Sequence, residues 1–280
     1  MDILEKIVAH KKLELARSKA ITAEALLEKS PFFARKTVSL REFLLDDRKT
    51  GIIAEFKRQS PSKGIINGQA GVFQVTKAYT AFGASGLSIL TDNHFFGGHQ
   101  DDIIKARGHE IPILRKDFII DPYQVREAKS IGADVVLLIA ACLSPMEVRS
   151  LAALAKSLQL EVLLEIHHQG ELDHICDEID LVGVNNRDLR TFAVDIRRSE
   201  SLSPLIPAGK IKITESGISS VDTIATLKRS GFQGFLIGEN FMKEPDPAIA
   251  FASFVNQLKK GPHESKSLRH DSTRSSEKTG

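Results

Sequence analysis

Charged side chains stand inside or directly after short apolar segments of this sequence. Glu55 and Lys57 close one such segment, Lys116 follows another, and Glu165 lies within a third. A buried charge is costly unless it is paired, so a whole set of such residues is difficult to explain as separate structural ion pairs. Lysines and carboxylates are groups that enzymes use for proton transfer, and lysines also attract anions. The pattern therefore predicts an active site for a small anionic substrate.

A scaffold that gathers these side chains is predicted by eight short apolar segments, all of them after Gly51. They span residues 52–56, 87–90, 111–114, 135–139, 162–166, 181–184, 211–213 and 235–237. Near-continuous apolar runs are typical of buried parallel strands. Helix-start signals lie between them, at Asp121-Pro122, at the capping box Ser144–Glu147 and at Ser219 with Asp222.

Eight strand–helix repeats predict an α/β fold, the (β/α)8 or TIM barrel, with the strand ends at one mouth. A doubly wound open sheet is the alternative, but the Gly-x-Gly-x-x-Gly turn expected after its first strand is missing. We expect residues 1–48 to form an N-terminal helical extension packed on the barrel, and residues 49–260 to form the catalytic barrel. Residues 261–280 are polar and nearly free of apolar side chains, which predicts a disordered tail.

The last two predicted strands are followed by a candidate phosphate site. Barrels commonly bind phosphate in the loops after strands seven and eight. Gly217 and Gly238 lie in those loops, where glycine lets backbone N–H groups approach an anion closely. A short helix is expected to begin at Glu239, whose own carboxylate should point away from a phosphate.

Composition excludes several other classes of function. The formal net charge of +2 is too small to indicate a nucleic-acid partner, and no apolar run approaches the roughly 18 residues of a membrane span. Cys142 and Cys176 are interpreted as reduced thiols, which together with the lack of a secretory signal predicts a cytoplasmic protein. His167 and His168 lack metal-ligand spacing and are interpreted as loop residues. No metal site is predicted.

Longer stretches of the sequence resemble the indole-3-glycerol phosphate synthase family. The most specific are AEFKRQSPSKG and LRKDFI, and together with LVGVNNRDLRTF, ITESGIS and FLIGENFM they extend the resemblance over roughly residues 50–245. The resemblance implies a lyase of tryptophan biosynthesis. Such an enzyme closes the indole ring of 1-(2-carboxyphenylamino)-1-deoxyribulose 5-phosphate, with loss of carbon dioxide and water. It needs no cofactor.

The resemblance also implies catalytic roles. Lys116 matches the general acid, with Lys57 as the alternative, and Glu165 matches the base or acid–base partner of the dehydration. Glu55 is expected to orient one of the lysines. Asn185 and Glu215 match positions that contact substrate hydroxyl groups or hold the lysines. A lysine among other cations in a closed site is expected to have a lowered pKa.

The substrate-binding residues follow from the same resemblance. Lys57 and Arg187 are placed to hold the substrate carboxylate. The phosphate cradle is expected from Ser60, Ser216, Gly217 and Gly238, and the walls around the substrate ring from Phe96 and Phe118.

Other functions remain open at this point. Another phosphate-binding barrel enzyme, such as phosphoribosylanthranilate isomerase or the tryptophan synthase α subunit, shares the fold, although the Cys/Asp or paired-Asp set expected of such an isomerase is not seen. A non-catalytic barrel is a further alternative. We expect a small phosphorylated substrate, no fused pathway enzyme, and a monomer or weak homodimer.

Overall fold

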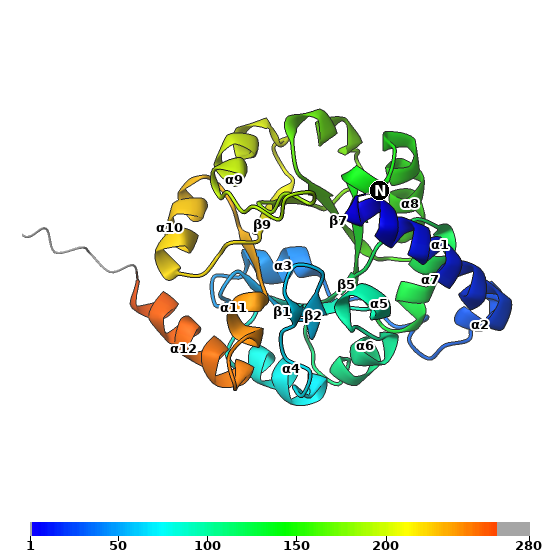
Figure 1. The fold of residues 1–280 in the computed structure, drawn as a ribbon, viewed down its shortest axis with the longest axis horizontal. Helices are drawn as coiled ribbons and strands as arrows, with labels where there is room; N and C mark the ends of the chain where they lie inside the picture. Colours follow the sequence, from blue (N-terminus) through cyan, green and yellow to red (C-terminus); the bar gives the residue numbers. More distant parts are fainter. Residues whose placement is uncertain (1, 262–280) are drawn as a thin grey trace, which may run out of the picture.

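The computed structural model describes residues 2–261. Its centre is a closed barrel of eight parallel strands in the order β1-β4-β5-β6-β7-β8-β9-β10 (Figure 1). The strands are β1 (Ile52–Phe56), β4 (Gly86–Leu90), β5 (Ile113–Lys116), β6 (Val135–Ile139), β7 (Glu161–Ile166), β8 (Leu181–Asn185), β9 (Ile211–Glu215) and β10 (Gly234–Ile237). The predicted fold class is therefore confirmed.

The eight predicted segments all become barrel strands, with one shift in register along the chain. The third was predicted at residues 111–114, but β5 begins at Ile113. Pro112 has no N–H to donate to a ladder, and its carbonyl accepts the bond from the Leu87 N–H at 2.9 Å. Because of this shift, Lys116 is the last residue of β5 and lies at the mouth of the barrel, where its side chain lines the cavity.

Helices surround the barrel, as Figure 1 shows. They are α4 (Val72–Ala81), α5 (Asn93–Phe96), α6 (Gln100–Ala106), α7 (Pro122–Ser130), α8 (Pro145–Ser157), α9 (Arg197–Leu202), α10 (Val221–Arg229), α11 (Glu239–Met242) and α12 (Pro247–Lys260). Short 3-10 helices are η1 (Ala140–Cys142), η2 (Gln169–His174) and η3 (Ser203–Leu205), and a small hairpin pairs β2 (Gln59–Ser60) with β3 (Gly64–Ile65). None of the described helices is long and apolar enough to cross a membrane.

The helix-start signals hold with one correction. Asp121 caps α7, and Ser144 with Glu147 forms the predicted capping box of α8. The start predicted at Ser219 is one residue early, because the hydroxyl of Ser220 accepts the Thr223 N–H and makes Ser220 the cap of α10.

Three helices precede the barrel: α1 (Ile3–Ile21), α2 (Glu24–Leu27) and α3 (Leu40–Leu45). Leu40 and Leu44 of α3 are buried against Ile53 and Ile213 inside the barrel, so this helix helps to fill the barrel interior. The α1 helix lies beside α7, whose Tyr123 hydroxyl donates to the Ser18 carbonyl at 3.3 Å (Figure 1). The tail predicted at 261–280 lies, apart from Gly261, outside the described residues.

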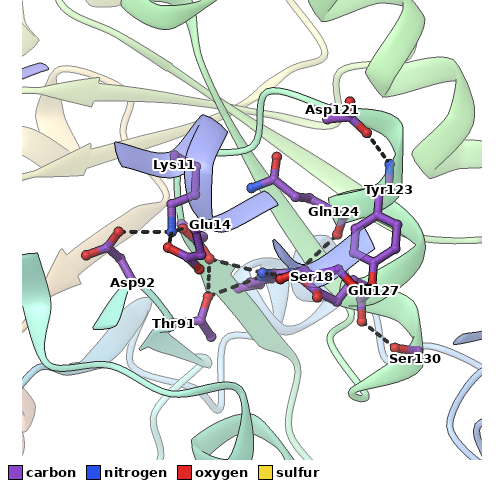
Figure 2. Close-up of polar contacts among 12 residues, drawn as sticks. Lys11, Glu14, Ser18, Thr91, Asp92, Asp121, Tyr123, Gln124, Glu127 and Ser130 are labelled. Atoms are coloured by element: carbon purple, nitrogen blue, oxygen red, sulfur yellow. Dashed lines mark hydrogen bonds and ion pairs between the residues drawn. The ribbon is translucent and has the colours of Figure 1, made fainter. Parts of the chain in front are cut away.

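A buried ionic cluster attaches α1 to the barrel (Figure 2). The Lys11 Nζ lies 2.9 Å from a carboxylate oxygen of each of Glu14, Asp92 and Asp117. Arg115 extends the cluster through Asp117 at 3.0 Å. Lys11 is only 1% exposed. Three carboxylates surround its ammonium group because a buried positive charge must be compensated by nearby negative charges. Two of its partners flank the site described next: Asp117 follows Lys116, and Asp92 caps α5.

Candidate active site

A cavity of about 540 Å³ opens at the carboxyl ends of the barrel strands. Every site residue predicted from the sequence lines it: Glu55, Lys57, Ser60, Phe96, Lys116, Phe118, Glu165, Asn185, Arg187, Glu215, Ser216, Gly217 and Gly238. The strands bring them together because parallel strands of a closed barrel end at one mouth. The volume is of the size that holds a small-molecule ligand.

Carboxylates and lysines alternate on the floor of this cavity. The Lys116 Nζ lies 3.4 Å from Glu165 Oε2 and 3.2 Å from Glu215 Oε2. The Lys57 Nζ lies 2.7 Å from Glu55 Oε1. The Asn185 amide donates to Glu165 Oε1 at 2.9 Å, which holds that carboxylate in place. These six residues meet in one cavity although they come from the ends of five different strands, β1, β5, β7, β8 and β9.

The pKa of Lys116 is raised, which corrects the expectation of a lowered one. Burial by itself lowers the pKa of this lysine, but Glu215, Glu165 and Glu55 raise it by more. The nearest charges are carboxylates from β1, β7 and β9, across the barrel mouth, rather than the cations that sequence neighbours suggested. Lys116 is therefore an ammonium ion at neutral pH, with a proton to give.

The carboxylates on the floor are held in different protonation states. Burial and the nearby Glu165 raise the pKa of Glu215 to about 8, despite the opposing effect of Lys116. Burial also disfavours the charge of Glu165, but Lys116 and then His167 hold its pKa well below the usual range for a glutamate. Like charges this close separate in pKa, and such a pair can divide the roles of acid and base.

The candidate phosphate loops are built from close backbone contacts. A Cβ at Gly238 would lie 2.5 Å from Glu55 Oε1, and one at Gly217 would lie 2.5 Å from a methyl carbon of Val194. Gly217 has a φ of 79°, and the preceding Ser216 has a φ of 68°. The Ser216 hydroxyl donates to Asn185 Oδ1 at 2.9 Å. The two loops therefore tolerate little beyond glycine, because neighbouring protein side chains occupy the Cβ side of both residues.

Glu239 does begin α11, as expected, but its side chain does not turn away from the cavity. It lines the cavity, with carboxylate oxygens 3.5 Å from Arg187 and 3.8 Å from Lys63. The attraction of these two cations gives the physical reason.

Aromatic and aliphatic side chains form one wall of the cavity. The rings of Phe96 and Phe118 have centroids 6.0 Å apart with an interplanar angle of 34°. Ile3, Leu4 and Ile7 of α1 also line the cavity, so the N-terminal helix forms part of the wall. The sequence did not identify these three as site residues.

His167 is the functional candidate that sequence reasoning missed. It was interpreted as a loop residue, and it does follow β7, but its ring is buried with Nε2 3.2 Å from Glu165 Oε1. His168 next to it exposes 69% of its side chain. The signal available in the sequence was the spacing of two between Glu165 and His167, which places both on one face of an extended chain.

A TIM barrel whose mouth combines paired lysines and glutamates with glycines after its last two strands is typical of a class, the barrel enzymes that act on small anionic substrates. The model of the indole-3-glycerol phosphate synthase family matches residues 4–254. The chain belongs to this family.

Individual relatives agree with that assignment. The chain is 46% identical over 259 residues to indole-3-glycerol phosphate synthase of Bacteroides thetaiotaomicron, covering 92% of this chain and 99% of the relative. It is 42% identical to the enzyme of Bordetella pertussis over 260 residues, or 91% and 99% of the two chains.

Among solved structures, the chain is similar in fold to one from the tryptophan synthase complex of Pyrococcus furiosus. The TM-score is 0.58 at 14% identity, over 76% of this chain and 99% of that one. Identity this low bears on the fold alone. The family membership makes the protein a carboxy-lyase of tryptophan biosynthesis that acts on a phosphorylated substrate.

Proposed function

We propose that Lys116 is the general acid of indole ring closure and that Glu165 is the base of the dehydration that follows. The observation that carries this proposal is the position of the Lys116 ammonium group, within 3.4 Å of Glu165 and 3.2 Å of Glu215 on the cavity floor. The Lys116 ammonium group is thus a proton donor with a proton acceptor beside it. The two groups match the two proton transfers that the reaction requires.

The chemistry assigns a task to each group. The ring carbon that carries the carboxylate bonds to the ketone carbon, and the ketone oxygen takes a proton from Lys116 to become a hydroxyl. Breaking of the carbon–carboxylate bond returns its electron pair to the ring and releases carbon dioxide. The hydroxyl then leaves as hydroxide, which solvent protonates to water, while Glu165 takes a proton from the pyrroline ring and so completes the aromatic indole.

Lys57 and Arg187 are proposed to hold the substrate carboxylate. Both line the cavity, and their side chains are 17% and 23% exposed. Glu55, 2.7 Å from Lys57, orients that lysine, which supports a binding role for Lys57 and leaves Lys116 as the acid. Asn185 and Glu215 hold the two catalytic residues at fixed positions.

The phosphate is proposed to bind at the loops after β9 and β10. Backbone N–H groups at Gly217 and Gly238 are its donors, with the hydroxyl groups of Ser60 and Ser216 beside them. Support comes from the position of both glycines directly after or near the ends of β9 and β10 and from the fact that the residues line the same cavity. Phe96 and Phe118 then enclose the substrate ring, because an aromatic ring packs favourably against apolar, π-rich walls.

The test is the appearance of indole-3-glycerol phosphate fluorescence from the carboxyphenylamino-deoxyribulose phosphate. Lys116→Ala and Glu165→Gln should each lower kcat by about 10²–10⁴-fold, the range for general acid–base groups. Lys57→Met is the matched control, and it should raise KM by about tenfold or more because a charge-assisted contact is lost. A Lys116→Ala variant with wild-type kcat would contradict the assignment of the acid.

We also infer that the protein works in the cytoplasm. Support comes from its two cysteines, which are both free thiols. A monomer or weak homodimer stays a prediction, and sedimentation equilibrium at several protein concentrations tests it.

A further inference from the structure

His167 lies between two carboxylates at the end of β7. Its Nε2 is 3.2 Å from Glu165 Oε1, and its Nδ1 is 3.6 Å from Glu171 Oε2. The same Glu171 carboxylate accepts the backbone N–H of His167 at 2.5 Å. The imidazole ring is buried. Each of its nitrogens lies at ion-pair distance from a carboxylate, but neither is aligned for a hydrogen bond. Glu171 therefore fixes His167, and His167 contacts the proposed base.

We propose that His167 is a positioning residue that keeps Glu165 ionised and in place for proton transfer. The inference rests on the proposed role of Glu165 as the base. His167 itself is behind that carboxylate and is not among the residues that line the cavity. It acts on the substrate through Glu165.

The surroundings of the ring favour an imidazolium ion. Burial by itself lowers the pKa of His167, but the carboxylates of Glu165 and Glu171 raise it by more. The resulting pKa is about 9. The other charged groups that bear on Glu165 are Lys116 from β5, Glu215 from β9 and Glu55 from β1. The remaining ones are the neutral Asn185 from β8 and the thiol of Cys142 from η1, whose pKa burial raises to about 12. His167 is therefore a second cation beside Glu165 at neutral pH.

A second cation matters because Lys116 does not keep its charge through the proposed reaction. When Lys116 gives its proton to the ketone oxygen, it becomes a neutral amine. Without His167, Glu165 would then lose the stabilisation of its charged form, and its pKa would rise. His167 supplies a charge that stays in place during that step, so Glu165 remains ionised until it takes its own proton.

The pH dependence of turnover tests this role, with His167→Gln compared with His168→Gln. Opposite charges within about 4–6 Å lower a carboxyl pKa by about 1–3 units, so His167→Gln should move the acidic limb of kcat/KM upward by about one pH unit or more. Its kcat should fall more than its KM changes. His168→Gln, next in the chain but largely exposed, should keep the wild-type profile. A folded His167→Gln variant with an unchanged acidic limb overturns the proposal.

A direct titration of the ring decides the matter even where His167→Gln does not fold. In wild-type protein labelled at the histidine rings, one imidazolium resonance should persist at pH 8. Glu171→Gln keeps an acceptor for the His167 N–H but loses the charge, and it should move that titration to lower pH. A His167 ring that titrates near 6.5, the ordinary histidine value, overturns the proposal. Wild-type turnover by Glu165→Gln would instead refute the proposed base and leave this titration unaffected.

Discussion

Replacement of Lys11 by methionine should release α1 from the barrel. Methionine has a similar length and no charge, so it removes the ammonium group and keeps most of the packing. Asp92 and Asp117 are both fully buried at their side chains. Asp117 keeps Arg115 and Thr91 as partners. The Asp92 Oδ2, in contrast, has no hydrogen bond among the described residues, and Lys11 at 2.9 Å is its charge partner.

The expected loss is large because one buried carboxylate is left without compensation. Removal of one partner of a buried ion pair costs about 3–5 kcal/mol. The matched control on the same helix is Lys19→Met, because Lys19 also lies 2.9 Å from an aspartate, Asp121, but is 43% exposed. An exposed pair of this kind is worth about 1 kcal/mol or less.

Amide hydrogen exchange across residues 3–21 measures the effect. Local opening of α1 should become easier by about 3–5 kcal/mol in Lys11→Met and by about 1 kcal/mol or less in Lys19→Met, since opening lets the stranded carboxylate reach water. Turnover should fall as well, because Asp117 follows Lys116 and Asp92 caps the helix that carries Phe96. Equal exchange in the two variants would refute the reasoning that the buried cluster holds the helix (Figure 2).

Three further outcomes are expected. Gly238→Ala should lose most activity in the fluorescence assay and destabilise the fold by about 1–3 kcal/mol, because the new Cβ would overlap Glu55 Oε1; unchanged kinetics would contradict the close contact. The raised pKa of Glu215, about 8, means that its contribution to stability is present below its unfolded pKa and is lost as the pH rises through 8. Glu215→Gln should therefore weaken the pH dependence of the urea unfolding midpoint between pH 5 and pH 8. A pH dependence as steep as that of the wild type would count against this expectation. Phe118→Leu should raise KM more than it lowers kcat in the same assay, since it removes part of a wall and no proton-transfer group; a selective loss of kcat would argue for another role.

Much of the barrel was predictable because its strand signals are local. An apolar run such as 135–139 becomes a strand wherever it is buried on both faces, and β6 spans those very residues. Caps such as Ser144 with Glu147 are local too, since they join groups three residues apart. Because parallel strands end at one mouth, the polar cavity residues at the strand ends could also be predicted once the barrel was recognised, whereas Ile3, Leu4 and Ile7 of α1 could not.

The helical extension shows the opposite case. In α1 the apolar Leu13 is 62% exposed, while the charged Lys11 is buried. The face that α1 buries depends on where Asp92 and Asp117 stand, and these come from other loops of the barrel. Periodicity within one helix carries no information about such partners.

What the sequence by itself determined is the set of strands, their order and the chemical types at their ends. What only the tertiary structure decided is the charge state of those groups. Lys116 has a raised rather than a lowered pKa because glutamates from β1, β7 and β9 surround it. His167 became a candidate through a contact of 3.2 Å with Glu165. Electrostatic energies depend on distances and burial between segments far apart in the chain, and these distances exist only once the barrel has closed.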